Sequence, residues 1–235
     1  MRRSLSPHPR YERLTMARKP GTQAPRLDAI VLDDLVAGDP EALRPHDVYE
    51  GLRFDAVDLA GRELSGIQFR ECVFDDVQAH DAVLRGATFS DVEFTRLNAP
   101  IFAAPRAELR SVTIDGSRLG SAELYESALS SVHISSTKLG FVNLSGATLL
   151  DVLFTGCSID ELDLGSAKLN RVAFVDCTIG VLSLHHATLT NVDLRRAELS
   201  RVDGFSALAG ATLSHGQVAD LASAFAEHLG IRVED

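Results

Sequence analysis

The sequence contains no Trp, only 2 Met and 3 Cys among 235 residues, and aromatic residues make up only 6%. A core must therefore be built from aliphatic side chains, and the hydrophobic content of 45% is enough for a sizeable one. Three Cys make no disulfide framework and suit a reducing compartment. No apolar run approaches the roughly 18 residues of a membrane-spanning helix, and the N-terminus lacks the apolar stretch of a signal peptide. We expect one long domain with tails, located in the cytoplasm.

Positive charge is concentrated at the N-terminus. Residues 1–26 hold seven Arg and Lys against the single acid Glu12, a net charge of +6, so residues 27–235 carry −16 of a chain total of −10. Pro7, Pro9, Pro20 and Pro25 deny this segment regular structure. We therefore predict a disordered basic tail over residues 1–26, and direct binding of nucleic acid is expected only through this tail.

A five-residue repeat runs from Phe54 to Leu199. Every fifth residue is Leu, Ile or Phe at 27 of 30 positions, without insertion or deletion. The three exceptions are Ala79, Ala99 and Ala104. The residue two places earlier is nearly always small or β-branched, as Ala147 is before Leu149, and polar residues and Gly fill the two places after it. Two inward residues around one outward residue are typical of a strand, and the polar pair is typical of a turn. Each unit predicts a very short strand and a corner.

A slower period of 20 residues sets the number of sides. Val-x-Phe or Val-x-Ile recurs at this spacing, beginning at Val92, Val112, Val132, Val152 and Val172. Four units per coil predict an all-β, four-sided parallel solenoid, in which coils about 4.8 Å apart give a rod roughly 36 Å long. We expect an N-terminal lead-in and cap over residues 27–50, about 7–8 coils over 51–204, and a C-terminal cap over 205–235. The lead-in is expected to form a short strand or a turn of helix over the first coil.

Pro100 and Pro105 mark the one strained coil. Leu97 and Phe102 are large where the pattern places a small residue, and the position two later is Ala in both cases. This exchange preserves the interior volume, and a corner is where the missing proline N–H costs least. We predict a distorted coil with a bend or bulge, and a functional loop is the alternative.

The register fails at Gly204, and a helical pattern follows. Ser214 and Gln217 fit a capping box. Apolar residues then recur at helical spacing, at Val218, Leu221, Phe225 and Leu229. We predict an amphipathic helix over residues 214–229 that covers the last coil, with a final strand at 231–233. The apolar side of this helix alternatively builds a homodimer.

Reactive residues are few and do not converge. Cys157 and Cys177 lie one coil apart and point inward, so we expect two free thiols packed as small hydrophobic side chains. His185 and His186 share an outward corner without a third metal ligand nearby. A rod also has no cleft from which water is excluded. We therefore predict no enzyme, no catalytic, cofactor-binding or metal site, no small-molecule substrate and no membrane partner.

Outward columns hold the candidate partner-binding residues. One column contains four acids and no base, namely Glu63, Glu123, Asp163 and Asp203. This acidic column either keeps the rod soluble or competes with DNA phosphates for a basic groove. Outward apolar residues form a second candidate, namely Phe141, Val181, Leu150 and Leu153. They favour a partner or dimer patch, although single exposed apolar residues need no explanation.

The units Gly146-Ala147-Thr148-Leu149 and Ser166-Ala167-Lys168-Leu169 resemble the pentapeptide-repeat family, over about residues 50–204. The resemblance implies a right-handed quadrilateral β-helix with a short C-terminal capping helix. It also implies that relatives include bacterial proteins that protect DNA gyrase from fluoroquinolones, whose acidic rod is thought to imitate a DNA duplex and which dimerise through C-terminal elements. The Asp or Asn that usually precedes the large residue is met only in some units, such as those of Asp58, Asn143, Asp163 and Asp193.

Two functional hypotheses follow. The first is a non-catalytic interaction or structural module with an unidentified protein partner. The second is a DNA mimic directed at a type II topoisomerase such as gyrase.

Overall fold

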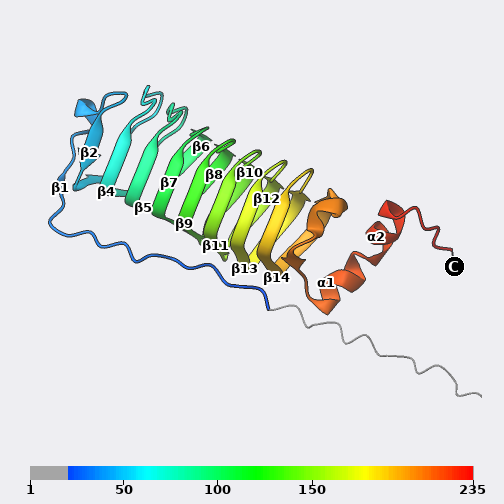
Figure 1. The fold of residues 1–235 in the computed structure, drawn as a ribbon. Coiled ribbons are helices and arrows are strands. Elements are labelled where there is room, and N and C mark those ends of the chain that lie inside the picture. Colours follow the sequence, from blue (N-terminus) through cyan, green and yellow to red (C-terminus); the bar gives the residue numbers. More distant parts are fainter. Residues whose placement is uncertain (1–20, 235) are drawn as a thin grey trace, which may run out of the picture.

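The computed structural model describes residues 21–234 and shows a straight rod of stacked coils (Figure 1). All strand pairs are parallel, and neighbouring coils pair residues that are 20 apart, as in Phe54 with Phe74. One column of paired residues runs Ala37, Arg53, Val73, Glu93, Thr113, His133, Leu153, Ala173, Asp193 and Thr212. The rod is therefore the predicted parallel β-solenoid, with nine coil-to-coil steps where the sequence predicted 7–8 coils.

The additional turns come from short strands at the two ends that lack the five-residue pattern. The strands near the N-terminus are β1 (Val36–Ala37), β2 (Val48–Glu50) and β3 (Leu52–Asp55), with the 3-10 helix η1 (Pro40–Ala42) between β1 and β2. At the other end η2 (Phe205–Leu208) leads into β15 (Ala211–Thr212), which pairs with β14. Pairing between coils uses only the backbone, so these segments extend the rod without the repeat.

Two kinds of strand alternate along the rod. Eight-residue strands turn through one corner, namely β4 (Gln68–Asp75), β5 (Thr88–Thr95), β7 (Glu108–Asp115), β9 (Ala128–Ser135) and β11 (Thr148–Thr155). Six-residue strands form the other sides, namely β6 (Asn98–Ala103), β8 (Arg118–Glu123), β10 (Lys138–Asn143) and β12 (Ser158–Asp163). Two long strands, β13 (Lys168–Ser183) and β14 (Thr188–Asp203), continue through several corners.

The interior follows the five-residue pattern closely. Of the 30 repeat positions, 29 are buried and Leu199 is half-buried. Aromatic rings stack from coil to coil, with centroids 4.9 Å apart between Phe54 and Phe74 and 4.7 Å apart between Phe154 and Phe174. The core is thus a set of side-chain columns that run the length of the rod.

The coil around Pro100 and Pro105 is regular, so the predicted bend or bulge is wrong. β6 pairs with β8 without a register shift, and Leu97, Phe102 and the two alanines of this coil are all buried. The exchange of large and small residues therefore fills the same interior volume without moving the backbone. An irregularity occurs elsewhere, where the register shifts between β13 and β14 near Val175.

The segment before β1 lies along the outside of the rod. Residues 21–35 run extended from beside the C-terminal coils back to the first coil (Figure 1), and we call them the strap. The predicted disordered tail lies outside the described residues up to residue 20, whereas residues 21–26 belong to the strap and form hydrogen bonds with the rod. Pro25 disfavours helix and sheet, yet it is compatible with an extended chain on a surface.

The C-terminal cap contains two short helices in place of the single predicted helix. These are α1 (His215–Asp220) and α2 (Ala222–His228), which meet at Leu221. The predicted capping box is present, because Ser214 accepts from the Gln217 amide and the Gln217 side chain accepts from the Ser214 amide. α2 projects beyond the end of the rod (Figure 1), and residues 231–233 form no strand. Within residues 21–234, no helix has the length and apolar character needed to cross a membrane.

Candidate interaction surfaces

The acidic column is a real stack in space. Backbone pairing places Glu63, Val83, Ala103, Glu123, Asn143, Asp163, Ser183 and Asp203 one above another. The sequence therefore identified the neighbours correctly. However, the uncharged residues Val83 and Ala103 lie between Glu63 and Glu123, so the negative charge is not continuous along this column.

Two acids of this column accept hydrogen bonds from backbone amides at the corners. Asp163 Oδ1 accepts a hydrogen bond from the Gly165 amide at 2.8 Å, and Glu63 Oε1 accepts one from the Ser65 amide at 3.0 Å. These bonds satisfy the amide that follows each corner, the same role that an Asx-turn gives to Asp or Asn. The Ser65 hydrogen bonds also lower the pKa of Glu63. A structural role therefore explains why an acid or Asn often precedes the large residue.

The two remaining acids of the column have side-chain partners. Glu123 accepts from Asn143 Nδ2 at 2.9 Å and from Ser121 Oγ at 2.9 Å. Asp203 forms an ion pair with Arg201 at 2.7 Å. The predicted acidic surface is thus partly neutralised where it is most negative, towards the C-terminal end.

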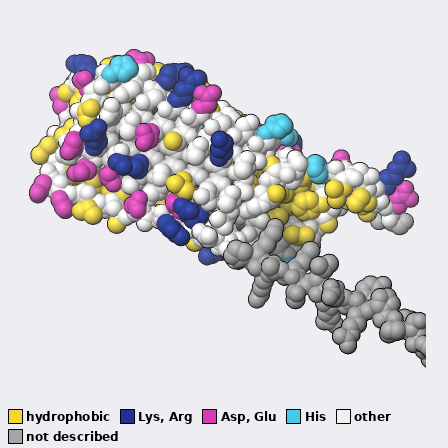
Figure 2. All heavy atoms as spheres, viewed as in Figure 1, with side chains coloured by type: hydrophobic (Ala, Val, Ile, Leu, Met, Phe, Trp, Pro, Cys, Tyr) yellow, Lys and Arg dark blue, Asp and Glu magenta, His cyan; other side chains and the backbone are white. Residues whose placement is uncertain are grey.

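Ion pairs between neighbouring positions are common over the rest of the rod. Examples at 2.6 Å are Arg106–Glu126, Arg195–Asp193 and Arg196–Asp176. On the face seen in Figure 2, Lys and Arg side chains are interspersed with Asp and Glu. This wall presents alternating charge, whereas a DNA duplex presents charge of one sign.

The outward apolar residues do not form one patch. Phe141 and Val181 both pair with Glu161, which separates them in the column. Leu153 stands between His133 and Ala173, and Leu150 stands between Ser130 and Asn170. All four predicted residues are half-buried. The apolar surface proposed from the sequence is therefore divided into single residues.

The exposed large apolar side chains of the C-terminal cap lie on α1 and after the end of α2. Val218 is 47% exposed and Leu229 is 71% exposed, followed by Ile231 at 56% and Val233 at 72%. By contrast, Leu221 is buried, and Phe225 packs edge-to-face on Phe205 with centroids 4.9 Å apart. Figure 2 shows hydrophobic side chains gathered at this end of the molecule. The four predicted helix residues thus divide into two that hold the cap together and two that face outward.

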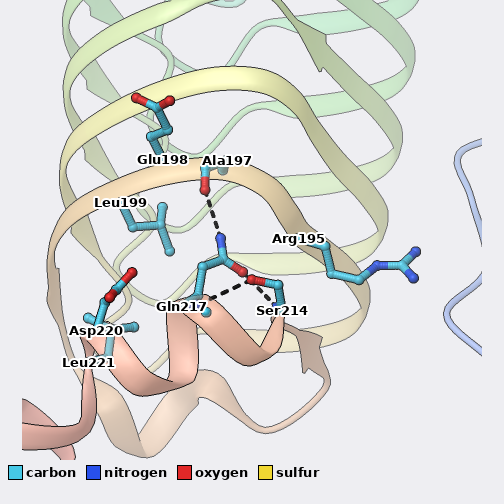
Figure 3. Close-up of a pocket in the computed structure, with 9 residues that line it drawn as sticks. Arg195, Ala197, Glu198, Leu199, Ser214, Gln217, Asp220 and Leu221 are labelled. Atoms are coloured by element: carbon cyan, nitrogen blue, oxygen red, sulfur yellow. Dashed lines mark hydrogen bonds between the residues drawn. The ribbon is translucent and has the colours of Figure 1, made fainter.

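A shallow pocket of about 340 Å³ lies between the last coil and α1 (Figure 3). Gln217 points from α1 towards the coil, and its Nε2 donates to Leu194 O at 2.6 Å and to Ala197 O at 2.7 Å. In the earlier coils, the carbonyl equivalent to that of Ala197 accepts from the next coil, as Cys157 O does from the Thr178 amide. The side chain of Gln217 therefore takes the place of the missing coil, and the pocket is a capping arrangement.

Titratable and thiol groups do not assemble into a reactive site. Cys72, Cys157 and Cys177 are buried and unpaired as disulfides, as predicted. The hydrogen bond with Cys177, together with burial, raises the pKa of Cys157, and burial raises the pKa of Cys72. Within the described part of the chain, no three His, Cys, Asp or Glu side chains gather in a way that would hold a metal ion.

One functional feature was not predicted from the sequence. The corner column that contains Ser131, Asp151 and Asn191 holds the strap, through side-chain oxygens that accept hydrogen bonds from strap amides. The only signal in the sequence is a column of polar residues at a corner, which is also what a turn requires.

Comparisons with known proteins agree with the repeat. The family model described as pentapeptide repeats matches residues 53–91 in 8 copies. A search of curated proteins gives no match.

Among solved structures, full-length QnrB1, a plasmid-mediated fluoroquinolone resistance protein, is 20% identical with a TM-score of 0.34. This match covers 83% of this chain and 95% of QnrB1. HetL, a pentapeptide-repeat protein involved in the regulation of heterocyst differentiation in the cyanobacterium Nostoc, is 19% identical with a TM-score of 0.34, over 75% of this chain and 94% of HetL. This chain therefore contains pentapeptide repeats at residues 53–91, and the coils continue the register of these repeats to Leu199.

Proposed function

We propose that this protein is a non-catalytic interaction module that binds a second protein surface through its C-terminal end. The observation that supports this most directly is the group of exposed apolar side chains of the C-terminal cap, namely Val218 on α1 and Leu229, Ile231 and Val233 after α2. Elsewhere on the rod, large apolar side chains are mostly buried or half-buried, and many charged ones are paired or bonded to a corner amide. Apolar surface gathered at one place is typical of an interface.

The proposed partner for this end is a second copy of the chain. An isologous contact between two copies brings the same apolar residues together across a twofold axis, so one exposed group is enough to build the interface. Leu221 and Phe225 hold the cap on each rod, and Leu229 and Val233 supply the contact.

Light scattering at several concentrations tests the dimer. The full chain should have a mass about twice 25.4 kDa, and Leu229→Asp combined with Val233→Asp should reduce it to that of one chain. The matched control is Ile101→Asp, because Ile101 is an exposed apolar residue on the wall of the rod. A monomeric wild-type chain, or a dimer that Ile101→Asp also dissociates, would contradict the proposed interface.

A topoisomerase-directed DNA mimic is the second candidate function. It is supported by the net charge of −16 on residues 27–235 within a chain total of −10 and by the stacking of the acidic column. A gyrase supercoiling assay with and without a fluoroquinolone tests it directly. If micromolar protein changes neither supercoiling nor its inhibition, this second candidate is wrong, whereas the dimer test above is unaffected.

A further inference from the structure

The strap follows a single corner of the rod, away from the acidic column. The amides of Gln23, Arg26 and Asp28 donate to Asn191, Asp151 and Ser131 in turn, and the coil of Arg171 lies between the first two acceptors. Thr22 also contacts Thr212 of β15 through its hydroxyl. The corner that holds the strap joins the side of the rod that buries Phe69 to the side that buries Phe74. The acidic column lies on the side of the rod opposite that of Phe74. The strap and the candidate acidic surface are therefore separate features.

The acceptors are side chains that the corner itself selects. Ser131, Asp151 and Asn191 all have left-handed backbone conformations, with φ of 57°, 57° and 54°. Short polar residues adopt this conformation at lower cost than β-branched or bulky ones. The requirement of the corner thus produces a line of polar side chains along the edge of the rod, in which Arg171 stands between the acceptors Asp151 and Asn191.

Two of the three acceptors, Ser131 and Asp151, are buried, and Asp151 also forms an ion pair. Asp151 is 8% exposed, and Arg171 donates to both of its carboxylate oxygens at 2.6 Å. Asp151 Oδ1 also accepts from the Arg26 amide at 2.8 Å. Ser131 is 5% exposed, and its Oγ accepts from the Asp28 amide at 2.7 Å. At the far end, Asn191 Oδ1 accepts from the Gln23 amide at 3.3 Å.

The strap is attached in a different way from the strands of the rod. No backbone–backbone hydrogen bond joins residues 21–35 to the coils within the described part of the chain. The contacts are instead backbone amides on side-chain oxygens, with half-buried side chains such as Pro25 and Ile30 between exposed ones. A segment with so few buried contacts opens more easily than the core does. The strap is therefore attached to the rod in the way that a bound peptide ligand is, and is not part of the sheet.

We propose that the corner column of Ser131, Asp151 and Asn191 is a docking track for an extended polypeptide, and that residues 22–30 are a separable ligand for it. In one chain the strap occupies its own track. A strap from a second copy competes for the same track, since it carries the same donors. This inference goes beyond the C-terminal interface, which uses other residues.

The track sets a simple requirement on its ligand. Donors are needed at the positions of Gln23, Arg26 and Asp28, so proline is excluded there. Proline is tolerated at position 25, where no donor is used. An extended ligand that already contains proline also loses less conformational entropy on binding.

The test uses the full chain with a weakened strap. Arg26→Pro combined with Asp28→Pro removes two strap donors and leaves the track unchanged. The probe is a fluorescent peptide with the wild-type sequence of residues 21–32, and binding is measured by anisotropy. We expect saturable binding to the double variant, and at least about tenfold weaker binding to the wild-type chain, whose own strap competes at a high effective concentration.

Matched variants separate the track from unspecific binding. Ser131→Ala, added to the double variant, should weaken peptide binding by about fivefold, since it removes one acceptor. Ser130→Ala is the control, because Ser130 is its half-buried neighbour. A peptide with proline at positions 26 and 28 should not bind. Circular dichroism confirms that each variant keeps its β-structure.

Two results would overturn the proposal. One is the absence of saturable binding to a folded double variant at millimolar peptide, and the other is equal binding of the proline-substituted peptide. Amide hydrogen exchange on the wild-type chain gives a second measurement that needs no variant. The amides of Arg26 and Asp28 should exchange at least about a hundredfold faster than those of the coils, and equal rates would show that the strap is an integral part of the rod.

Discussion

The replacement of Phe154 by Ala tests whether the columns of the interior hold the rod together. Phe154 is 1% exposed and stacks on Phe174, with ring centroids 4.7 Å apart and planes inclined by 7°. On its other side, Ile134 pairs with it in the same column. Backbone hydrogen bonds on both sides hold this coil at a fixed spacing, so the walls cannot move inward to fill the space left by the ring.

The expected cost is therefore near the upper end of the usual range for Phe→Ala, about 4 kcal/mol in the free energy of unfolding. With a urea m-value of about 3 kcal/mol/M for a domain of this size, the unfolding midpoint should fall by roughly 1.3 M. Phe141→Ala is the matched control, because Phe141 is the outward, half-buried phenylalanine of the preceding coil. It should cost about 1 kcal/mol or less.

Urea unfolding followed by circular dichroism at the β-sheet band measures both variants. Equal costs for Phe154→Ala and Phe141→Ala would refute the reasoning, because they would mean that inward packing contributes no more than surface packing. A changed m-value for Phe154→Ala alone would indicate that part of the rod unfolds separately, which a linear array of coils permits.

Three further predictions concern the cap, the thiols and the strap. Gln217→Ala should lower the free energy of unfolding by about 2 kcal/mol in the same urea assay, and Gln217→Glu, which keeps the capping acceptor but sets a carboxylate oxygen against the carbonyls of Leu194 and Ala197, should lower it at least as much. A thiol reagent should leave all three cysteines unmodified in the native protein and modify them after unfolding, because all three are buried; rapid modification of Cys157 would contradict the inward column. The hydrogen bond from Arg171 holds the pKa of Asp151 below its ordinary value, so this carboxylate stabilises the folded chain at pH values above about 3.9, and the contribution is lost as the pH falls through the lowered pKa. The NMR shift of the Arg26 amide should accordingly move only on that acid side, and a transition near neutral pH, or the same transition in Asp151→Asn, would contradict the contact.

The interior was predictable because its information is repeated. Each coil repeats the same alternation of large and small residues. Even the exchange at Leu97 and Phe102 is compensated within one coil, because a small residue takes the usual large position. The bend expected at Pro100 did not occur, since a corner already accommodates proline. The extra turns at the ends were missed because β1 and β15 join the rod by backbone pairing, which needs no particular side chains.

The strap and the outer surface were much harder to predict. The strap donates backbone amides, which every residue except proline carries, so Gln23 and Asp28 left no pattern in the sequence. The stacking of the acidic column follows from the 20-residue period, but the partners of its acids do not, because the sequence does not show that Asp163 bonds a corner amide or that Asp203 pairs with Arg201.

The pairing of residues 20 apart also determines how this protein can change in length. An insertion of 20 residues adds one full coil, about 4.8 Å, and leaves every wall facing as before. An insertion of only five residues keeps the interior pattern intact but turns everything after it by a quarter of a revolution about the rod axis. Such a change would carry the C-terminal helices to a new side and move Asn191 out of line with Asp151 and Ser131. A duplication of five residues thus rotates the part of the rod that follows it, whereas a duplication of 20 residues lengthens the rod without rotating it.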